Sequence, residues 1–215
     1  MKRGLFMAAF VIGLGAMAQA QELRWPALHD VIGVEADDVL NIRAEPSGSA
    51  PVIGTLLPDA VGVEVVGVNK SGAWGRVNTE EQSGWVSLRF LSRRAGQDYG
   101  DPLNPKSCFG TEPFWFVDLE IGTDSFAWLS PEAEQTGAVI KRLTSHNQRD
   151  IQSMILRFNA PAEAEPLAWN DGVMVMRPAA CSDGMSDRSY GIHADLVVQR
   201  SDGSRLLSGC CTLAN

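Results

Sequence analysis

Short apolar segments separated by turn residues run through the first half of the chain. They cover residues 31–34, 39–42, 52–57, 61–68, 73–77 and 84–88 and are apolar or β-branched. Gly, Pro, Ser, Asn and acidic residues lie between them, and no amphipathic helical stretch interrupts the series. Strands this short and this evenly spaced are typical of a small barrel or sandwich. We therefore predict a small β domain over residues 29–92.

A second series of predicted strands follows in the second half. Trp115, Val117, Leu119 and Ile121 occupy alternate positions, which is the period of a half-buried strand. Further candidate strands cover 125–129, 138–143, 151–158, 173–176, 192–198 and 205–208. Residues 93–106 are polar and rich in Gly and Pro, which predicts a linker. The predicted fold is all-β, with a second antiparallel barrel or half-barrel over residues 107–214.

The first twenty residues have the three parts of a secretory signal peptide. Lys2 and Arg3 precede an apolar run over residues 5–18, and Ala18-Gln19-Ala20 forms a cleavage site. The run is shorter than the roughly 20 residues of a membrane-spanning helix, so a membrane anchor is the less favoured alternative. We therefore expect a Sec-type signal over residues 1–20, export to the periplasm, and no membrane insertion of the mature chain.

The net charge of the chain limits the kinds of partner that it can attract. Signal cleavage would leave 16 basic and 26 acidic residues, and the net charge would change from −8 to −10. An acidic protein has no electrostatic attraction for nucleic acid or anionic lipid, so we expect neither as a partner. The composition is 45% apolar, which favours a folded protein over a disordered one.

Four motifs of the first half follow one another in a recognisable order. They are Leu-Asn-Ile-Arg-Ala-Glu-Pro-Ser at 40–47, Val-Ile-Gly-Thr-Leu at 52–56, Trp-Gly-Arg-Val at 74–77 and Gly-Trp-Val at 84–86. Together they resemble the bacterial SH3 (SH3b) domains. The resemblance implies an SH3-like barrel that acts at the cell wall or as an exported binding module. It implies a peptidoglycan stem peptide or an envelope protein as partner.

Arg43, Glu45, Trp74 and Trp85 are the candidate ligand-binding residues of this domain. Trp74 and Trp85 are eleven residues apart, so we expect them to pack across a hairpin. Core packing is favoured for Trp85, because large aromatic side chains are buried more often than displayed. Core and ligand roles are weighted equally for Trp74. For Arg43 the favoured role is to anchor a loop, through carbonyl groups or the carboxylate of Glu45 or Asp59.

Three motifs mark the second half. They are Gly-Thr-Glu-Pro-Phe-Trp at 110–115, Cys-Ser-Asp-Gly-Met-Ser at 181–186 and Leu-Ser-Gly-Cys at 207–210. They resemble an uncharacterised family of exported bacterial β domains, a resemblance that implies no reaction or ligand. Glu112, Trp115, Asp183 and Tyr190 are the candidate site residues. For Glu112 the favoured role is to accept backbone hydrogen bonds, and for Asp183 to form a turn.

All four cysteines, Cys108, Cys181, Cys210 and Cys211, lie after residue 107. An even number of cysteines in an oxidising compartment indicates disulfides. Cys210 and Cys211 face opposite sides of a strand and are expected to bond to different partners, because a bond between neighbours would be strained. The second-half resemblance implies Cys181–Cys210 together with Cys108–Cys211.

The sequence gives little support for catalysis. Cys181 with His193 is a possible nucleophile pair, but disulfide formation and the acidic surroundings of Cys181 argue against a reactive thiol. The three histidines are scattered, without the spacing of metal ligands, and no phosphate loop or dinucleotide motif is present. We therefore expect no metal and no cofactor.

The sequence thus predicts an exported, non-catalytic protein that binds cell-wall peptide or an envelope protein. Three alternatives stay open. The first is a periplasmic inhibitor or interaction protein that acts on another exported enzyme. The second is an enzyme whose site contains Glu112 and the loop at 181–190. In the third, the SH3b-like unit is only a structural spacer and binds no ligand.

Overall fold

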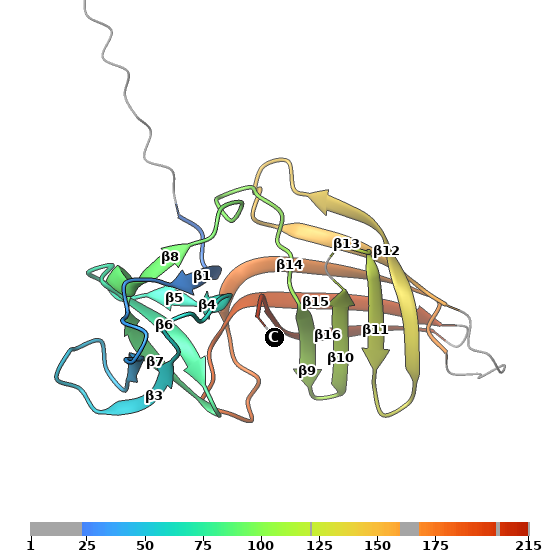
Figure 1. Ribbon diagram of the computed structural model, residues 1–215. Coiled ribbons are helices and arrows are strands. Elements are labelled where there is room, and N and C mark those ends of the chain that lie inside the picture. Colours follow the sequence, from blue (N-terminus) through green and yellow to red (C-terminus); the bar gives the residue numbers. More distant parts are fainter. Residues whose placement is uncertain (1–22, 121, 160–167, 201–202, 215) are drawn as a thin grey trace, which may run out of the picture.

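The computed structural model describes residues 23–120, 122–159, 168–200 and 203–214, so the predicted signal peptide and Ile121 lie outside the described residues. Within these ranges the regular secondary structure is almost entirely β-strand, which confirms the predicted all-β class. Figure 1 shows two β units side by side. We call residues 23–93 the N-terminal unit and residues 107–212 the C-terminal barrel.

The N-terminal unit consists of two small antiparallel sheets. One contains β1 (Ala27–Val31), β4 (Val63–Val65) and β8 (Leu91–Arg93) in the order β4-β1-β8. The other contains β2 (Leu40–Arg43), β3 (Val52–Leu56), β5 (Gly67–Val68), β6 (Trp74–Thr79) and β7 (Gln82–Ser87) in the order β3-β2-β7-β6-β5. Both sheets contribute to one apolar core of Val31, Leu40, Ile42, Val65, Val77, Val86 and Leu91.

A short 3-10 helix, η1 (Leu88–Phe90), precedes β8. In the part of the chain that the structure describes, no helix has the length and apolarity to cross a membrane.

The segment predicted as one strand at 61–68 is divided between the two sheets. β4 pairs with β1, whereas β5 pairs with β6. Between them, the backbone N–H of Val66 donates to the carbonyl of Arg76 at 2.9 Å. β8 was not expected as a strand, because Leu91 is its one buried residue and it therefore shows no alternation.

The second half forms a closed antiparallel barrel, which confirms the predicted architecture. Its strands are β9 (Ser107–Thr111), β10 (Phe114–Glu120), β11 (Ser125–Leu129), β12 (Glu134–Thr144), β13 (Gln152–Phe158), β14 (Asp171–Cys181), β15 (Tyr190–Arg200) and β16 (Gly203–Thr212). Each pairs with the next along the chain, and β16 closes the barrel by pairing with β9. Trp115, Val117 and Leu119 are buried, as the alternation predicts.

Apolar side chains fill the inside of the barrel. Trp115 and Trp128 stack with their ring centroids 6.1 Å apart, and Trp128 meets Trp169 edge to face at 6.0 Å. Met154, Met174, Met176 and Leu196 are among the other residues that are at most 1% exposed. The barrel is thus a packed core, and its lumen leaves no open channel along these residues.

Residues 94–106, predicted as part of a linker, are packed against both units. The backbone N–H of Leu28 donates to Oε1 of Gln97 at 2.6 Å. Leu103 is 2% exposed and belongs to the core of the C-terminal barrel. The polar composition of this segment therefore does not predict that Leu103 belongs to the core, because a single buried leucine produces no periodic pattern.

Two disulfides lie in the C-terminal barrel. Cys108 of β9 is bonded to Cys211 of β16, and Cys181 at the end of β14 is bonded to Cys210. This pairing coincides with the one that the second-half resemblance implies. Cys108, Cys210 and Cys211 are at most 1% exposed, whereas Cys181 is partly exposed.

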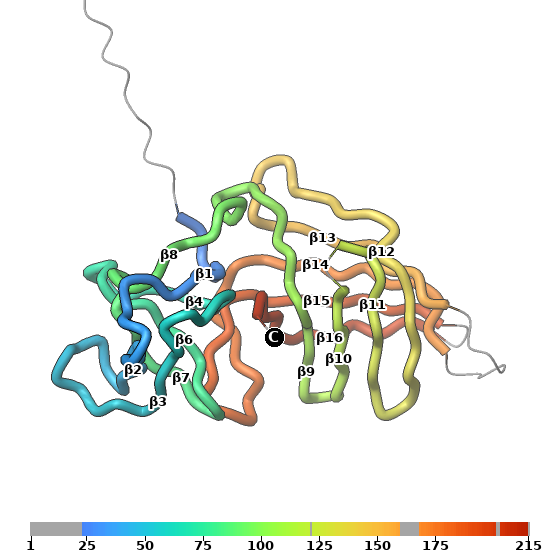
Figure 2. Tube along the Cα trace, in the orientation of Figure 1, coloured from blue at the N-terminus to red at the C-terminus, as the bar shows by residue number. Residues whose placement is uncertain are grey.

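The tip of the β6–β7 hairpin contacts the loop between β14 and β15 (Figures 1 and 2). The N–H of Asp187 donates to the carbonyl of Glu81 at 2.9 Å, and the N–H of Ser83 donates to the carbonyl of Asp187 at 3.1 Å. Asn78 exchanges two hydrogen bonds with the backbone of Ser189, at 2.9 and 3.0 Å. These backbone contacts fix the N-terminal unit against the barrel.

Candidate ligand-binding sites

The four residues predicted in the N-terminal unit lie in different places. Arg43 and Trp74 line one pocket of this unit, whereas Trp85 lines a cleft between the two units. Trp74 pairs with Ser87 and Trp85 with Arg76, so both tryptophans lie on the same face of the β6–β7 hairpin. Among the described aromatic contacts, none joins the two rings. Glu45 is exposed in the loop after β2 and lines neither space.

The first pocket, which we call the unit pocket, has a volume of about 490 Å³. Its walls are the loop between β1 and β2, strand β2, the start of β6 and helix η1. Nη1 of Arg43 donates to the carbonyl of Ala50 at 2.7 Å, so Arg43 does anchor a loop, through a carbonyl. Trp74 and Phe90 provide half-buried aromatic surface.

The unit pocket has charges of both signs along its walls. Glu35 and Asp38 come from the loop between β1 and β2, and Arg43 and Arg89 from the other walls. Across the described residues, none of these four charged groups belongs to an ion pair. Glu35, Asp38 and Arg89 are exposed and can reach a ligand with amino and carboxylate groups, whereas Arg43 also holds the Ala50 carbonyl.

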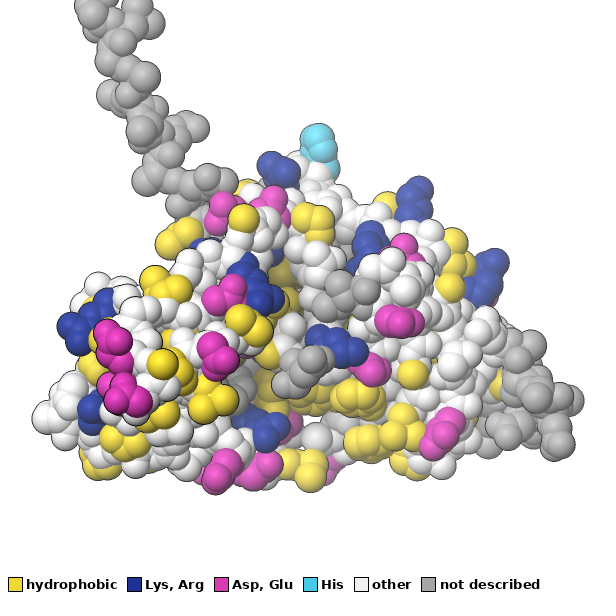
Figure 3. Space-filling model, in the orientation of Figure 1, with side chains coloured by type: hydrophobic (Ala, Val, Ile, Leu, Met, Phe, Trp, Pro, Cys, Tyr) yellow, Lys and Arg dark blue, Asp and Glu magenta, His cyan; other side chains and the backbone are white. Residues whose placement is uncertain are grey.

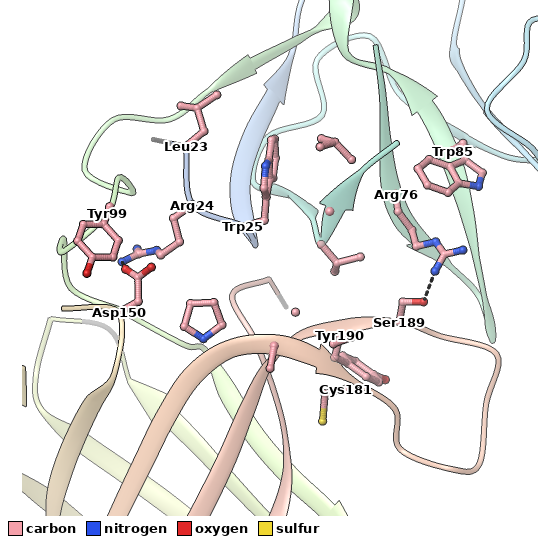
Figure 4. Close-up of a pocket in the computed structure, with 17 residues that line it drawn as sticks. Leu23, Arg24, Trp25, Arg76, Trp85, Tyr99, Asp150, Cys181, Ser189 and Tyr190 are labelled. Carbon is pink, nitrogen blue, oxygen red and sulfur yellow. Dashed lines mark hydrogen bonds and ion pairs between the residues drawn. The ribbon is translucent and has the colours of Figure 1, made fainter. Parts of the chain in front are cut away.

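The second space, which we call the interunit cleft, has a volume of about 660 Å³. Figure 4 shows Trp25 above it, Arg76 and Trp85 at one end, and Arg24, Tyr99 and Asp150 at the other. Cys181, Ser189 and Tyr190 lie on the barrel side. The guanidinium of Arg76 stacks over the Trp85 ring at 4.9 Å.

An apolar pocket of about 260 Å³ adjoins the cleft and shares Leu23, Trp25 and Val68 with it. His29 lines this pocket and stacks on Trp25, with ring centroids 5.6 Å apart. Burial lowers the pKa of His29 below its ordinary value, and the positive charge of Arg93 acts in the same direction. His29 is therefore neutral at neutral pH, and Arg93 is the charged group among the described residues that line this pocket.

The residues predicted in the second half do not form one site. Trp115 is 1% exposed inside the barrel, where no ligand reaches it. Glu112 and Asp183 both line a shallow pocket of about 370 Å³ beside the β9–β10 turn. Glu112 is exposed, and no described residue donates a hydrogen bond to its carboxylate, so the structure does not support the role expected for it.

Asp183 shapes the loop between β14 and β15, as expected. Its carboxylate accepts hydrogen bonds from the N–H groups of Met185 and Ser186, both at 3.0 Å, and from the hydroxyl of Ser186 at 2.8 Å. Tyr190 also donates to it, at 3.3 Å. Burial acts to raise the pKa of Asp183, but these hydrogen bonds outweigh it and lower that pKa. Its carboxylate is occupied by its own loop.

All four cysteines are in disulfides, so no thiol is present. This excludes the Cys181–His193 nucleophile. Outward-facing His193 instead lies 3.7 Å from Asp195, which Arg177 contacts at 3.0 Å.

The sequence pointed to Trp85 and Tyr190 of the interunit cleft but not to most of the other residues that line it. Trp25, Arg76 and the segment 178–181 come from three distant parts of the chain. Of these, the sequence could have indicated Arg76 as an exposed residue near the tryptophans. It lies between Trp74 and Val77 in a strand motif, and the alternation of that strand places its side chain on the outer face.

Two small antiparallel sheets around a shared apolar core define the first half as a small all-β domain with a lateral pocket. Comparison with protein families identifies it: residues 38–92 match the bacterial SH3 domain. The match does not extend to the second half, whose resemblance to a family of exported domains stays a prediction. Searches of curated proteins and of solved structures gave no significant match.

Proposed function

We propose that the protein is an exported binding protein whose SH3 domain docks on a peptide of the cell wall or of an envelope protein. The bacterial SH3 domain at residues 38–92 supports this proposal, because such domains often bind cell-wall components. Two disulfides support export, because such bonds persist in oxidising compartments.

The unit pocket carries this proposal. It combines the Trp74 ring with two carboxylates and two guanidinium groups that have no described ion-pair partners. A stem peptide or a flexible envelope segment presents amino groups, carboxylates and small apolar side chains at short intervals. An aromatic floor with charges of both signs complements such a ligand.

The test is co-sedimentation of the mature protein, residues 21–215, with isolated peptidoglycan sacculi. We expect saturable binding that weakens as salt is added, since the pocket charges are exposed and screened. Trp74→Ala should lower the affinity at least about tenfold, the size of loss typical of an aromatic anchor. Phe114→Ala is the matched control, because Phe114 is 45% exposed and lies on the barrel outside every pocket described above.

Two outcomes contradict the proposal in different ways. Absence of sedimentation, combined with capture of an exported enzyme whose activity the protein lowers, would favour the inhibitor alternative. Loss of binding in Trp85→Ala but not in Trp74→Ala would move the interaction from the unit pocket to the interunit cleft.

A further inference from the structure

Three sets of contacts hold the two units together and so fix the shape of the interunit cleft. The hairpin contacts of Asn78 with Ser189 form one end. At the other end Nη1 of Arg24 donates to the carbonyl of Asp101 at 2.7 Å and lies 3.5 Å from Oδ1 of Asp150. A further contact between the two units lies outside the cleft lining, where Glu64 accepts a hydrogen bond from the hydroxyl of Thr212. A preformed cleft costs little ordering entropy when a ligand binds.

The N-terminal segment rests directly on the barrel at Gly191. A side-chain carbon at Gly191 would lie 2.8 Å from Cδ of Pro26, so glycine permits this close approach. The neighbouring residue, Trp25, lies over the cleft (Figure 4).

Most residues that line the barrel side of the cleft are small, among them Ala179, Ala180 and Gly191. Strand β14 has a bulge there, since Pro178 pairs with Ile192 and Cys181 with Tyr190, which leaves Ala179 and Ala180 opposite Gly191. A bulge leaves one residue without ladder hydrogen bonds. The opposite wall includes residues 66–68, and β5 is the edge strand of its sheet. Edge strands and bulges both offer backbone groups to an extended peptide.

The charges of the cleft leave one guanidinium group unpaired. Arg24 is 3% exposed at its side chain and is matched by Asp150, the one acidic residue that lines the cleft. Arg76 is exposed, and within the described ranges no carboxylate lies at ion-pair distance from it. Its Nη1 atom lies 3.4 Å from Oγ of Ser189. In an acidic protein with a net charge of −8, this is a local positive site.

We infer that the interunit cleft binds a short peptide with an apolar C-terminal side chain and a free C-terminal carboxylate. The carboxylate contacts the guanidinium of Arg76 in charge-assisted hydrogen bonds, and the hydroxyl of Ser189 turns toward it from its present partner, Oγ of Ser83. The backbone runs between β5 and the β14 bulge. The apolar side chain packs beside Trp25, toward the adjoining apolar pocket around His29.

This site is separate from the unit pocket, and its ligand need not come from the cell wall. The volume of about 660 Å³ suits two or three residues, since small-molecule sites measure roughly 300–1,000 Å³. Trp85 contributes by holding Arg76 in place through its stacked ring.

The test is isothermal titration calorimetry of the mature protein with acetyl-Ala-Ala-Phe that has a free carboxylate, and with the same peptide as its C-terminal amide. We expect the acid to bind and the amide to bind at least about tenfold more weakly, as expected for loss of a hydrogen bond to a charged group. Arg76→Gln should weaken binding of the acid by a similar factor and leave the amide unaffected. The matched control is Arg157→Gln, because Arg157 is exposed on the barrel at a distance from the cleft lining.

Equal affinity for acid and amide, or unchanged binding of the acid by Arg76→Gln, would overturn the inference. So would the lack of any heat at millimolar peptide. Folding is checked by thermal unfolding of each variant, and Arg76 is exposed enough for its replacement to keep the fold. Trp74→Ala should bind the acid normally, so failure of the unit-pocket proposal and failure of this one give different patterns.

Discussion

Two glycines in the second-half motifs make room for Trp115. A side-chain carbon at Gly110 would overlap the Trp115 indole and lie 2.7 Å from the carbonyl oxygen of Ser208. At Gly209 it would overlap the backbone of Phe109 and lie 2.9 Å from Cζ2 of Trp115. The Gly-Thr-Glu-Pro-Phe-Trp and Leu-Ser-Gly-Cys motifs are therefore explained, at these positions, by close packing of β9, β10 and β16.

We predict that Gly110→Ala and Gly209→Ala each destabilise the barrel by about 1–3 kcal/mol, the cost of overpacking a dense core. Gly48→Ala is the control, because nothing lies within 4 Å of the added carbon. Urea unfolding measures the three free energies. Equal midpoints for all three variants would show that the strands can separate at no cost.

At the scale of elements, each disulfide fixes a different part of the barrel. Cys108–Cys211 joins β9 to β16, where the barrel closes, and spans 103 residues of chain. Cys181–Cys210 ties the end of β14 to β16 across 29 residues. In the chain-entropy model the longer loop contributes about 4.7 kcal/mol and the shorter one about 3.6 kcal/mol.

We predict that the double variant Cys108→Ala/Cys211→Ala loses more stability than Cys181→Ala/Cys210→Ala, by about 1 kcal/mol or more. Burial adds to the difference, because Cys108 and Cys211 are both 0% exposed and their removal leaves a void. Guanidinium unfolding of the two variants measures it, with a thiol assay to verify four blocked cysteines in the parent. The reverse order would mean that the β14 tie, and not closure of the barrel, dominates stability.

Across the whole molecule, Glu64 joins the N-terminal unit to the end of the C-terminal barrel. It is 8% exposed and accepts a hydrogen bond from the hydroxyl of Thr212. Burial raises the pKa of Glu64 above its usual value, although this hydroxyl and the N–H groups of Leu213 and Ala214 act to lower it. A carboxyl group whose pKa is raised by folding stabilises the folded state most when it is protonated. The contribution of Glu64 to the free energy of unfolding is therefore fully present below a pH of about 4.5, its ordinary pKa, and is lost as the pH rises through the raised pKa.

We predict that Glu64→Gln gains stability over the parent as the pH rises from acidic to neutral. Glutamine keeps an oxygen acceptor for Thr212 but has no charge to desolvate. The measurement is urea unfolding across this pH range, and Glu134→Gln, an exposed position on the barrel, is the control. Parallel pH profiles for parent and Glu64→Gln would show that Glu64 has the same pKa in both states.

Much of this fold was predictable because its signals are local. Alternation placed Trp115, Val117 and Leu119 inside a sheet, since successive side chains of a strand face opposite sides. The ordered motifs of residues 40–86 identified the SH3 domain, and the family match over 38–92 confirms it. The division of residues 61–68 between two sheets was not predictable. The alternation of apolar and polar residues in a strand shows which side chains are buried, but it does not show which strand pairs with it.

The sequence alone thus determined the all-β class, the SH3 domain and the presence of disulfide-forming cysteines, each of which depends on short-range pattern or composition. Tertiary structure alone decided that Trp74 lines the unit pocket and Trp85 the interunit cleft, although both lie on one hairpin face. It also brought Trp25, Arg76 and Ala179 around one space. The physical reason is that the alternation of apolar and polar residues shows which side chains are buried. The packing of segments that are distant in the sequence decides which residues those side chains contact.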